Sequence, residues 1–120
     1  MIGYVDASYA NDEKYASISG NAFLLGNSLI SWMSQKQQTA ALSSAEAEYV
    51  ALTPAVQETL WQKEFLANLG YPQQTVVLHE DNLSCIALSK NPQNHQKTRH
   101  IQTKYHWIRG KQKEKEFKLQ

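Results

Sequence analysis

The alternation of apolar and polar residues divides the chain into short strand-like segments and longer segments with a helical period. Runs rich in β-branched and aromatic residues, bounded by turn residues, predict strands over residues 2–8, 18–25, 28–34, 75–80 and 115–120. Gly26-Asn27 joins the second and third strands in the manner of a two-residue hairpin turn. The fourth strand is wholly apolar over residues 76–78, which favours a central position in the sheet.

A helical period begins after Ser43. Ser43 and Glu46 have the spacing of a capping box, in which the serine side chain and the glutamate satisfy free N–H groups at the start of a helix. Apolar residues then recur every three or four positions as far as Gly70, which predicts an amphipathic helix that ends there. Pro54 interrupts the pattern, so that either Thr53 caps a second segment or one helix kinks at the proline.

Two more helices are predicted, a short one over residues 82–90 and a longer one over residues 100–111, separated by a loop. The resulting order, β-β-β-α-β-α-α-β, predicts an α/β fold. An antiparallel three-stranded meander would be followed by crossover-linked strands in a mixed sheet with helices packed against it. The length of 120 residues suits a single domain over residues 1–120.

Composition narrows the class of protein. With 42% hydrophobic and 19% charged residues, the chain can bury a core and does not have the composition of a disordered segment. It has neither an apolar run long enough to span a membrane nor a leader of the secretory type. The lone Cys85 cannot form an internal disulfide, so we expect an intracellular protein without a membrane partner.

Charge is unevenly distributed along the chain. Residues 1–96 carry four Lys/Arg and nine Asp/Glu, a balance of −5, whereas residues 97–120 carry eight and two, a balance of +6. Such a basic end can contact phosphate groups without reading sequence, with Lys97, Arg99, Lys104 and Arg109 as the candidate cations. The alternative is a solvated, lysine-rich terminus, and composition alone favours that alternative.

Three acidic residues stand at predicted strand ends or at the start of the long helix, namely Asp6, Glu48 and Asp81. If their carboxylates converge, they form an oxygen-rich site for Mg²⁺, or for Mn²⁺, of the kind used in two-metal hydrolysis of phosphodiesters. Each residue also has an ordinary explanation: a turn-capping acid for Asp6, an exposed helix residue for Glu48, and an N-cap for Asp81.

Two neighbouring glutamates compete for the helix position in this site. Glu46 and Glu48 lie about 200° apart around a helix, so only one can face the sheet. We assign Glu46 to the capping box and Glu48 to the site. Three other acids, Asp12, Glu13 and Glu80, are expected to be solvated.

Four stretches of sequence together resemble the ribonuclease H domain of copia-type retrotransposon polyproteins: GYVDASYA, SGNAFLLGNSLISWMSQKQQTAALSSAEAEYVAL, HEDNLSCIALSKNP and KTRHIQTKYHWIRGK. The resemblance covers essentially the whole chain. It implies a mixed five-stranded sheet whose first three strands are antiparallel and whose last two are parallel to the first. Asp6, Glu48 and Asp81 match the catalytic, metal-binding acids of that family, and Asn82 follows the third acid as a candidate nucleic-acid contact.

The resemblance implies Mg²⁺- or Mn²⁺-dependent endonucleolytic hydrolysis of the RNA strand of RNA–DNA hybrids. It also implies a polyprotein with an upstream reverse transcriptase, in the cytoplasm, a virus-like particle or the nucleus. The alternative is a catalytically silent remnant that binds nucleic acid or acts as a scaffold. Active members carry a fourth carboxylate in a helix after the fifth strand, whereas this chain ends at EFKLQ. We therefore expect at best weak activity and an uncovered apolar face on the first, fourth and fifth strands, with self-association through that face. We also expect the last strand, residues 115–120, to be poorly held.

Overall fold

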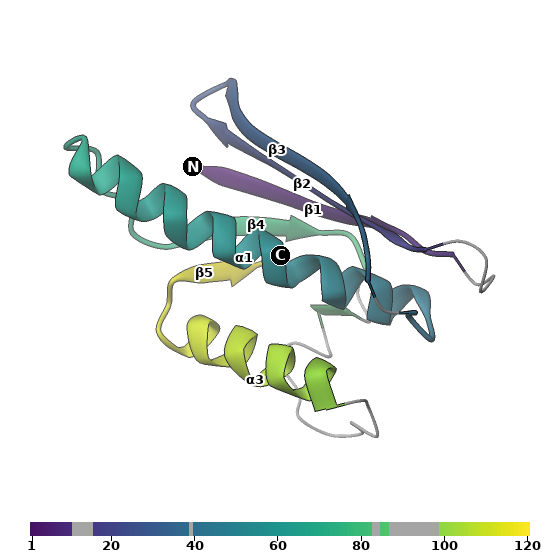
Figure 1. The fold of residues 1–120 in the computed structure, drawn as a ribbon. Coiled ribbons are helices and arrows are strands. Elements are labelled where there is room, and N and C mark those ends of the chain that lie inside the picture. Colours follow the sequence, from purple (N-terminus) through teal and green to yellow (C-terminus); the bar gives the residue numbers. More distant parts are fainter. Residues whose placement is uncertain (11–15, 39, 83–84, 87–98) are drawn as a thin grey trace.

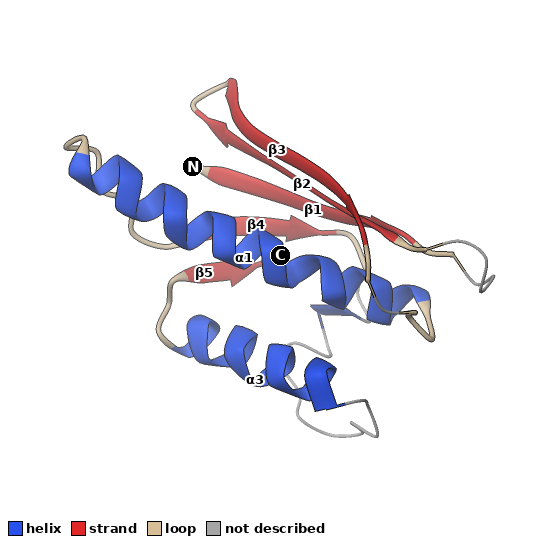
Figure 2. Cartoon of the chain, viewed as in Figure 1, coloured by secondary structure: helices blue, strands red, loops and turns tan. Residues whose placement is uncertain are grey.

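The computed structural model describes residues 1–10, 16–38, 40–82, 85–86 and 99–120, with the side chains of residues 99–102 left undescribed. The strands and helices follow one another in the order that the sequence predicts (Figure 2). In chain order they are β1 (Ile2–Ser8), β2 (Ile18–Leu25), β3 (Ser28–Lys36), α1 (Ser44–Asn68), β4 (Val76–Glu80), α3 (Arg99–Lys113) and β5 (Phe117–Leu119). β3 is two residues longer than expected. Of the predicted helix 82–90, the described residues Cys85 and Ile86 are helical, and the loop 91–98 lies outside the described residues.

The five strands form one mixed sheet in the order β3-β2-β1-β4-β5 (Figure 1). β2 pairs antiparallel with both β1 and β3, whereas β4 pairs parallel with β1 and with β5. This arrangement confirms the predicted α/β sheet. The carboxyl ends of β1 and β4 meet at the same edge, where side chains from the two strands can act together.

Helix α1 begins and ends where local sequence specifies. Ser43 is the N-cap, and its hydroxyl accepts a hydrogen bond from the backbone N–H of Glu46 at 3.1 Å. At the other end, the N–H of Tyr71 bonds to the carbonyl of Leu66 at 2.8 Å, and Gly70 has a φ of 90°. These are the features of a Schellman motif, which favours glycine.

One continuous helix runs through Pro54, so Thr53 does not cap a second segment. An interior proline removes a hydrogen-bond donor and costs about 3 kcal/mol. The residues around it are fully buried against the sheet, including Leu52, Ala55 and Val56. Burial of this face offsets the cost of the proline, which a local reading of the sequence does not capture.

The core lies between one face of the sheet and the two long helices. Buried side chains come from all layers: Val5, Phe23, Leu52, Leu78, Ile108, Phe117 and Leu119. The predicted inner face of α3 is confirmed for Tyr105 and Ile108, which are buried in this cluster, whereas the side chain of Ile101 lies outside the description. Gly3 sits where β1 passes between Phe23 and Leu78, and a Cβ there would lie 2.6 Å from Phe23 Cε1.

The opposite face of the sheet exposes large apolar side chains, because in the described part of the chain both long helices pack on the core side. These side chains are Ile2, Tyr4, Leu29 and Trp32. The expectation of an uncovered apolar face is therefore met on β1 but not on β4 and β5, whose described residues include no exposed large apolar side chain. The other exposed apolar side chains of this face lie on β3. Strand β5 is nonetheless well seated, with Phe117 and Leu119 buried and Gln120 N–H bonded to the Leu78 carbonyl at 2.9 Å. Within the described ranges, no helix combines the length and apolar character needed to cross a membrane.

Candidate metal centre

Three acids from three separate elements meet at one edge of the sheet. Asp6 lies near the end of β1, and Asp81 directly follows β4. The parallel pairing aligns Val5 with Glu80. The residues that follow these two along the chain, Asp6 and Asp81, are therefore neighbours. Glu48 reaches the same place from the second turn of α1, which packs on β1.

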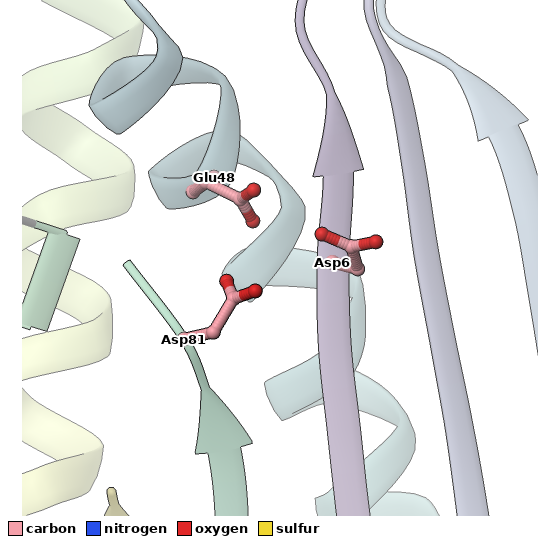
Figure 3. Close-up of side chains that lie close together, drawn as sticks. All are labelled: Asp6, Glu48 and Asp81. Atoms are coloured by element: carbon pink, nitrogen blue, oxygen red, sulfur yellow. The ribbon is translucent and has the colours of Figure 1, made fainter. Parts of the chain in front are cut away.

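One carboxylate oxygen from each of Asp6, Glu48 and Asp81 lies within 4.8 Å of the other two (Figure 3). The convergence expected from the sequence is therefore observed, with Glu48 rather than Glu46 directed at the two aspartates. Their catalytic and metal-binding roles stay predictions. Glu46 is buried near the start of α1, where its N–H bonds to Ser43, in keeping with its place in the cap.

The carboxyl group of Glu48 has a strongly raised pKa. Burial raises its pKa to about 7, and the negative charges of Asp6 and Asp81 add to the rise. The backbone N–H of Ala7 and a hydrogen bond with the side chain of Glu80 act in the opposite direction. The same N–H of Ala7 donates to Asp6 Oδ1 at 2.9 Å, so it serves two acids.

Glu80 is buried behind this centre, next to Glu48, which corrects the expectation that it is solvated. Its side chain is 4% exposed, because Val76, Leu78 and Glu80 alternate along β4 and all face the core. Its Oε1 accepts a hydrogen bond from the N–H of Asn82 at 3.1 Å. Burial raises its pKa to about 8, and the charge of Glu48 adds to this effect. The signal in the sequence that could have predicted this burial is the period-two alternation of β4, which places Glu80 on the same face as Val76 and Leu78. The other two acids expected to be solvated, Asp12 and Glu13, lie outside the described residues.

Glu48 and Glu80 form a carboxyl pair. A side-chain hydrogen bond joins the two groups. Each also leaves one buried oxygen, Oε2, without an N–H or O–H donor in the described part of the chain. A proton held between the two carboxyl groups would satisfy both observations.

A residue next to Asp81 caps the helical turn at Cys85. The side chain of Asn82, one residue later, accepts a hydrogen bond from the N–H of Cys85 at 2.9 Å and caps that helical turn. Asp81 itself is exposed and faces the other acids. Its carboxylate is therefore accessible to a cation from solvent.

The donor set fits a hard divalent cation. Three carboxylates offer the oxygen ligands that Mg²⁺ and Mn²⁺ prefer, and a cation between them would relieve their mutual repulsion. Asp6 and Asp81 are exposed, which leaves an entry path from solvent. An open pocket of about 490 Å³ lies beside them. It is lined by Tyr4, Val5, Asp6, His79, Glu80, Asp81 and Gln120.

Only some of the residues predicted to contact nucleic acid lie in the described part of the chain. Lys104 and Arg109 lie on α3, where the guanidinium of Arg109 stands 5.6 Å from the ring centre of Tyr105. Asn82 is engaged as a helix cap. Lys97 and the side chain of Arg99 lie outside the described residues. The contacts of these residues with nucleic acid stay predictions.

Comparison with known proteins gives clear relatives, although no family model matches the chain. The retrovirus-related Pol polyprotein from transposon TNT 1-94 of Nicotiana tabacum is 44% identical over 108 residues, which are 89% of this chain. That from transposon RE2 of Arabidopsis thaliana is 37% identical over 109 residues. The match spans 8% of each relative, so this chain corresponds to a small part of those polyproteins.

Solved structures share the fold. LC11-RNase H1, isolated from compost, superposes with a TM-score of 0.71 at 15% identity, over 99% of this chain and 81% of that one. The same protein in complex with an RNA/DNA hybrid gives 0.65 at 14% identity, over 99% and 83%. Prototype foamy virus protease-reverse transcriptase gives 0.62 at 15% identity, over 99% of this chain and 17% of that one. At these identities the likeness establishes the fold.

Proposed function

Since the chain belongs to the ribonuclease H-like domains of retrotransposon Pol polyproteins, we propose that it hydrolyses the RNA strand of RNA–DNA hybrids endonucleolytically with Mg²⁺ or Mn²⁺. The observation that carries this proposal is the convergence of Asp6, Glu48 and Asp81 to within 4.8 Å at the carboxyl ends of two parallel strands. A polyprotein with an upstream reverse transcriptase, working in the cytoplasm, a virus-like particle or the nucleus, is the corresponding biological setting.

The three acids divide the work of holding a cation. Asp6 and Asp81 supply exposed carboxylates from adjacent strand ends, and Glu48 supplies a buried one from above the sheet. A divalent cation held by these three carboxylates would supply the Lewis-acid chemistry that phosphodiester hydrolysis needs. The chain then needs no side-chain nucleophile, and its own contribution is to fix the geometry of the carboxylates.

Substrate binding would use a different part of the surface. Lys104 and Arg109 place positive charge on α3, within the basic segment of the chain. Such cations contact phosphates without selecting sequence, while a hybrid is distinguished by its shape and its 2′-hydroxyl groups. The complex of LC11-RNase H1 with an RNA/DNA hybrid supports this substrate class by analogy of fold.

The test is incubation with a hybrid whose RNA strand is labelled, in the presence of Mg²⁺ or Mn²⁺. We expect internal cleavage of the RNA strand, no cleavage of a matched RNA or DNA duplex, and loss of cleavage with a chelator or in Asp6→Asn and Asp81→Asn. Binding of the hybrid without cleavage under any of these conditions would instead identify a catalytically silent, nucleic-acid-binding domain. Fluorescence anisotropy with the same labelled hybrid separates the two results.

A further inference from the structure

We propose that Glu80 is a positioning residue, which holds the side chain of Glu48 toward Asp6 and Asp81 and thereby sets the affinity of the metal centre. This inference rests on the proposed function, because it assigns Glu48 to that centre. Glu80 itself is not among the acids whose oxygens all converge within 4.8 Å. It therefore acts through Glu48 rather than as a direct ligand.

Glu80 is well fixed for such a role. It is the last residue of β4, which lies between β1 and β5. Its backbone N–H donates to the carbonyl of Gln120 at 2.7 Å, and its Oε1 accepts from the N–H of Asn82 at 3.1 Å. Both ends of the residue are therefore anchored, and its remaining oxygen, Oε2, is buried.

Glu48 depends on this anchor. A glutamate on a helix has three rotatable side-chain bonds, so its carboxylate needs contacts to select one position. One such contact is the N–H of Ala7, which also donates to Asp6. The other is the hydrogen bond with Glu80. Partners of this kind behind a metal-binding group orient it, and their removal lowers metal affinity.

The position would otherwise suit an apolar residue. Val76 and Leu78 precede Glu80 on the same face of β4 and are buried in the core. A buried carboxyl group costs free energy that an apolar side chain of similar volume does not. A purely structural role leaves this cost unexplained, whereas the positioning of Glu48 accounts for it.

The experiment compares Glu80→Gln with Glu80→Met in the full chain. Glutamine keeps the shape, an acceptor for Asn82 and a donor for Glu48, whereas methionine keeps the volume and loses both hydrogen bonds. Glu64→Gln, at an exposed position on α1, is the matched control. Mg²⁺ affinity is measured by calorimetry, and crystal structures of the metal-free variants locate the Glu48 carboxylate.

We expect Glu80→Met to lower Mg²⁺ affinity about 10- to 100-fold and to release Glu48 from its place beside the aspartates, while circular dichroism shows a folded protein. Glu80→Gln and Glu64→Gln should retain both the affinity and the Glu48 position. The proposal is overturned if Glu48 keeps its position in Glu80→Met and Mg²⁺ binds as in the wild type.

The proposed function has a separate criterion. If calorimetry detects no Mg²⁺ binding by wild type and the same result for Glu48→Gln, the metal centre is absent and the proposed function fails. The positioning role is then still decided by the crystal structures, because displacement of Glu48 in Glu80→Met alone supports it and an unchanged Glu48 refutes it.

Discussion

Glu80 and Asp81 are consecutive residues that face opposite environments: Glu80 is 4% exposed among core residues, whereas Asp81 is exposed at the rim of the acidic cluster. The alternation of side chains at the end of β4 produces this difference. One carboxyl group is thus available to a cation from solvent, and the other contacts Glu48 from the core side. Substitutions at these two adjacent positions should therefore have different consequences.

Asp81→Asn should remove most of the stabilisation that Mg²⁺ gives to the folded protein. At a Mg²⁺ concentration a hundredfold above Kd, wild type should gain about 2.7 kcal/mol. Without metal, the variant should be as stable as wild type or more so, because one repulsive charge is lost and Asn82 still caps the following turn. Thermal unfolding with and without millimolar Mg²⁺ measures both effects. An equal response to Mg²⁺ in wild type and variant would show that Asp81 does not bind the cation.

Stability of the metal-free protein should fall as pH rises. Burial raises the pKa of Glu48 from 4.5 to about 7 and that of Glu80 to about 8. Between the unfolded and folded pKa values, the folded state therefore binds more protons than the unfolded state. The stabilisation that these protons give to the folded state is complete below about pH 4.5, and it is lost as pH rises through the folded-state pKa values of about 7 and about 8. Urea unfolding with a chelator, from pH 5 to about pH 8, measures this slope.

The double variant Glu48→Gln/Glu80→Gln is the control for this slope, because neither amide titrates. It should show a flatter dependence on pH than wild type over the same range. Mg²⁺ should act in the opposite sense, since the cation competes with protons for the carboxylates and binds more tightly as pH rises. A wild-type slope equal to that of the double variant would contradict the assignment of raised pKa values to this pair.

Gly3→Ala should destabilise the fold by about 1–3 kcal/mol, as overpacking of a filled core does. The added Cβ would meet Phe23 Cε1 at 2.6 Å and the side chain of Leu78 more closely still, and both side chains are fully buried. Gly110→Ala is the matched control. Nothing lies within 4 Å of a Cβ at Gly110 in α3, so this change should stabilise the protein by up to about 1 kcal/mol. Chemical denaturation of both variants measures the change in the free energy of unfolding, which should be a loss for Gly3→Ala and a gain for Gly110→Ala.

The features that the sequence predicts well are those that depend on neighbouring residues. Ser43 and Gly70 mark the ends of α1 because capping uses groups within a few positions along the chain. The strand ends that carry Asp6 and Asp81 follow from the apolar runs before them, and parallel pairing then brings the two acids together.

The features that it missed depend on tertiary packing. Helix α1 continues through Pro54 because burial against the sheet outweighs the local cost, and no pattern around the proline reports that balance. The charge of Glu80 predicts exposure to solvent, whereas its place in the period-two pattern of β4 buries it. Its buried contacts are with Glu48 and Asn82, which lie on another element or beyond the strand, so the strand's own sequence does not reveal them.

The uncovered sheet face should cause reversible self-association. Trp32 on β3 is 74% exposed and Tyr4 on β1 is 49% exposed, on the side of the sheet away from both long helices. Exposed apolar surfaces of this kind associate in water. Trp32→Ser should therefore shift the protein toward monomer. Sedimentation velocity over a range of concentrations measures the mass without labels.

Trp61→Ser is the matched control, because Trp61 is also an exposed tryptophan, at 57%, but lies on α1 and stacks on Phe65 with ring centres 5.2 Å apart. If the sheet face is the interface, this change should leave the association constant near that of wild type. Association that disappears in Trp61→Ser and persists in Trp32→Ser would instead place the contact on α1. A wild-type protein that stays monomeric at all concentrations would show that the exposed sheet face alone does not drive association.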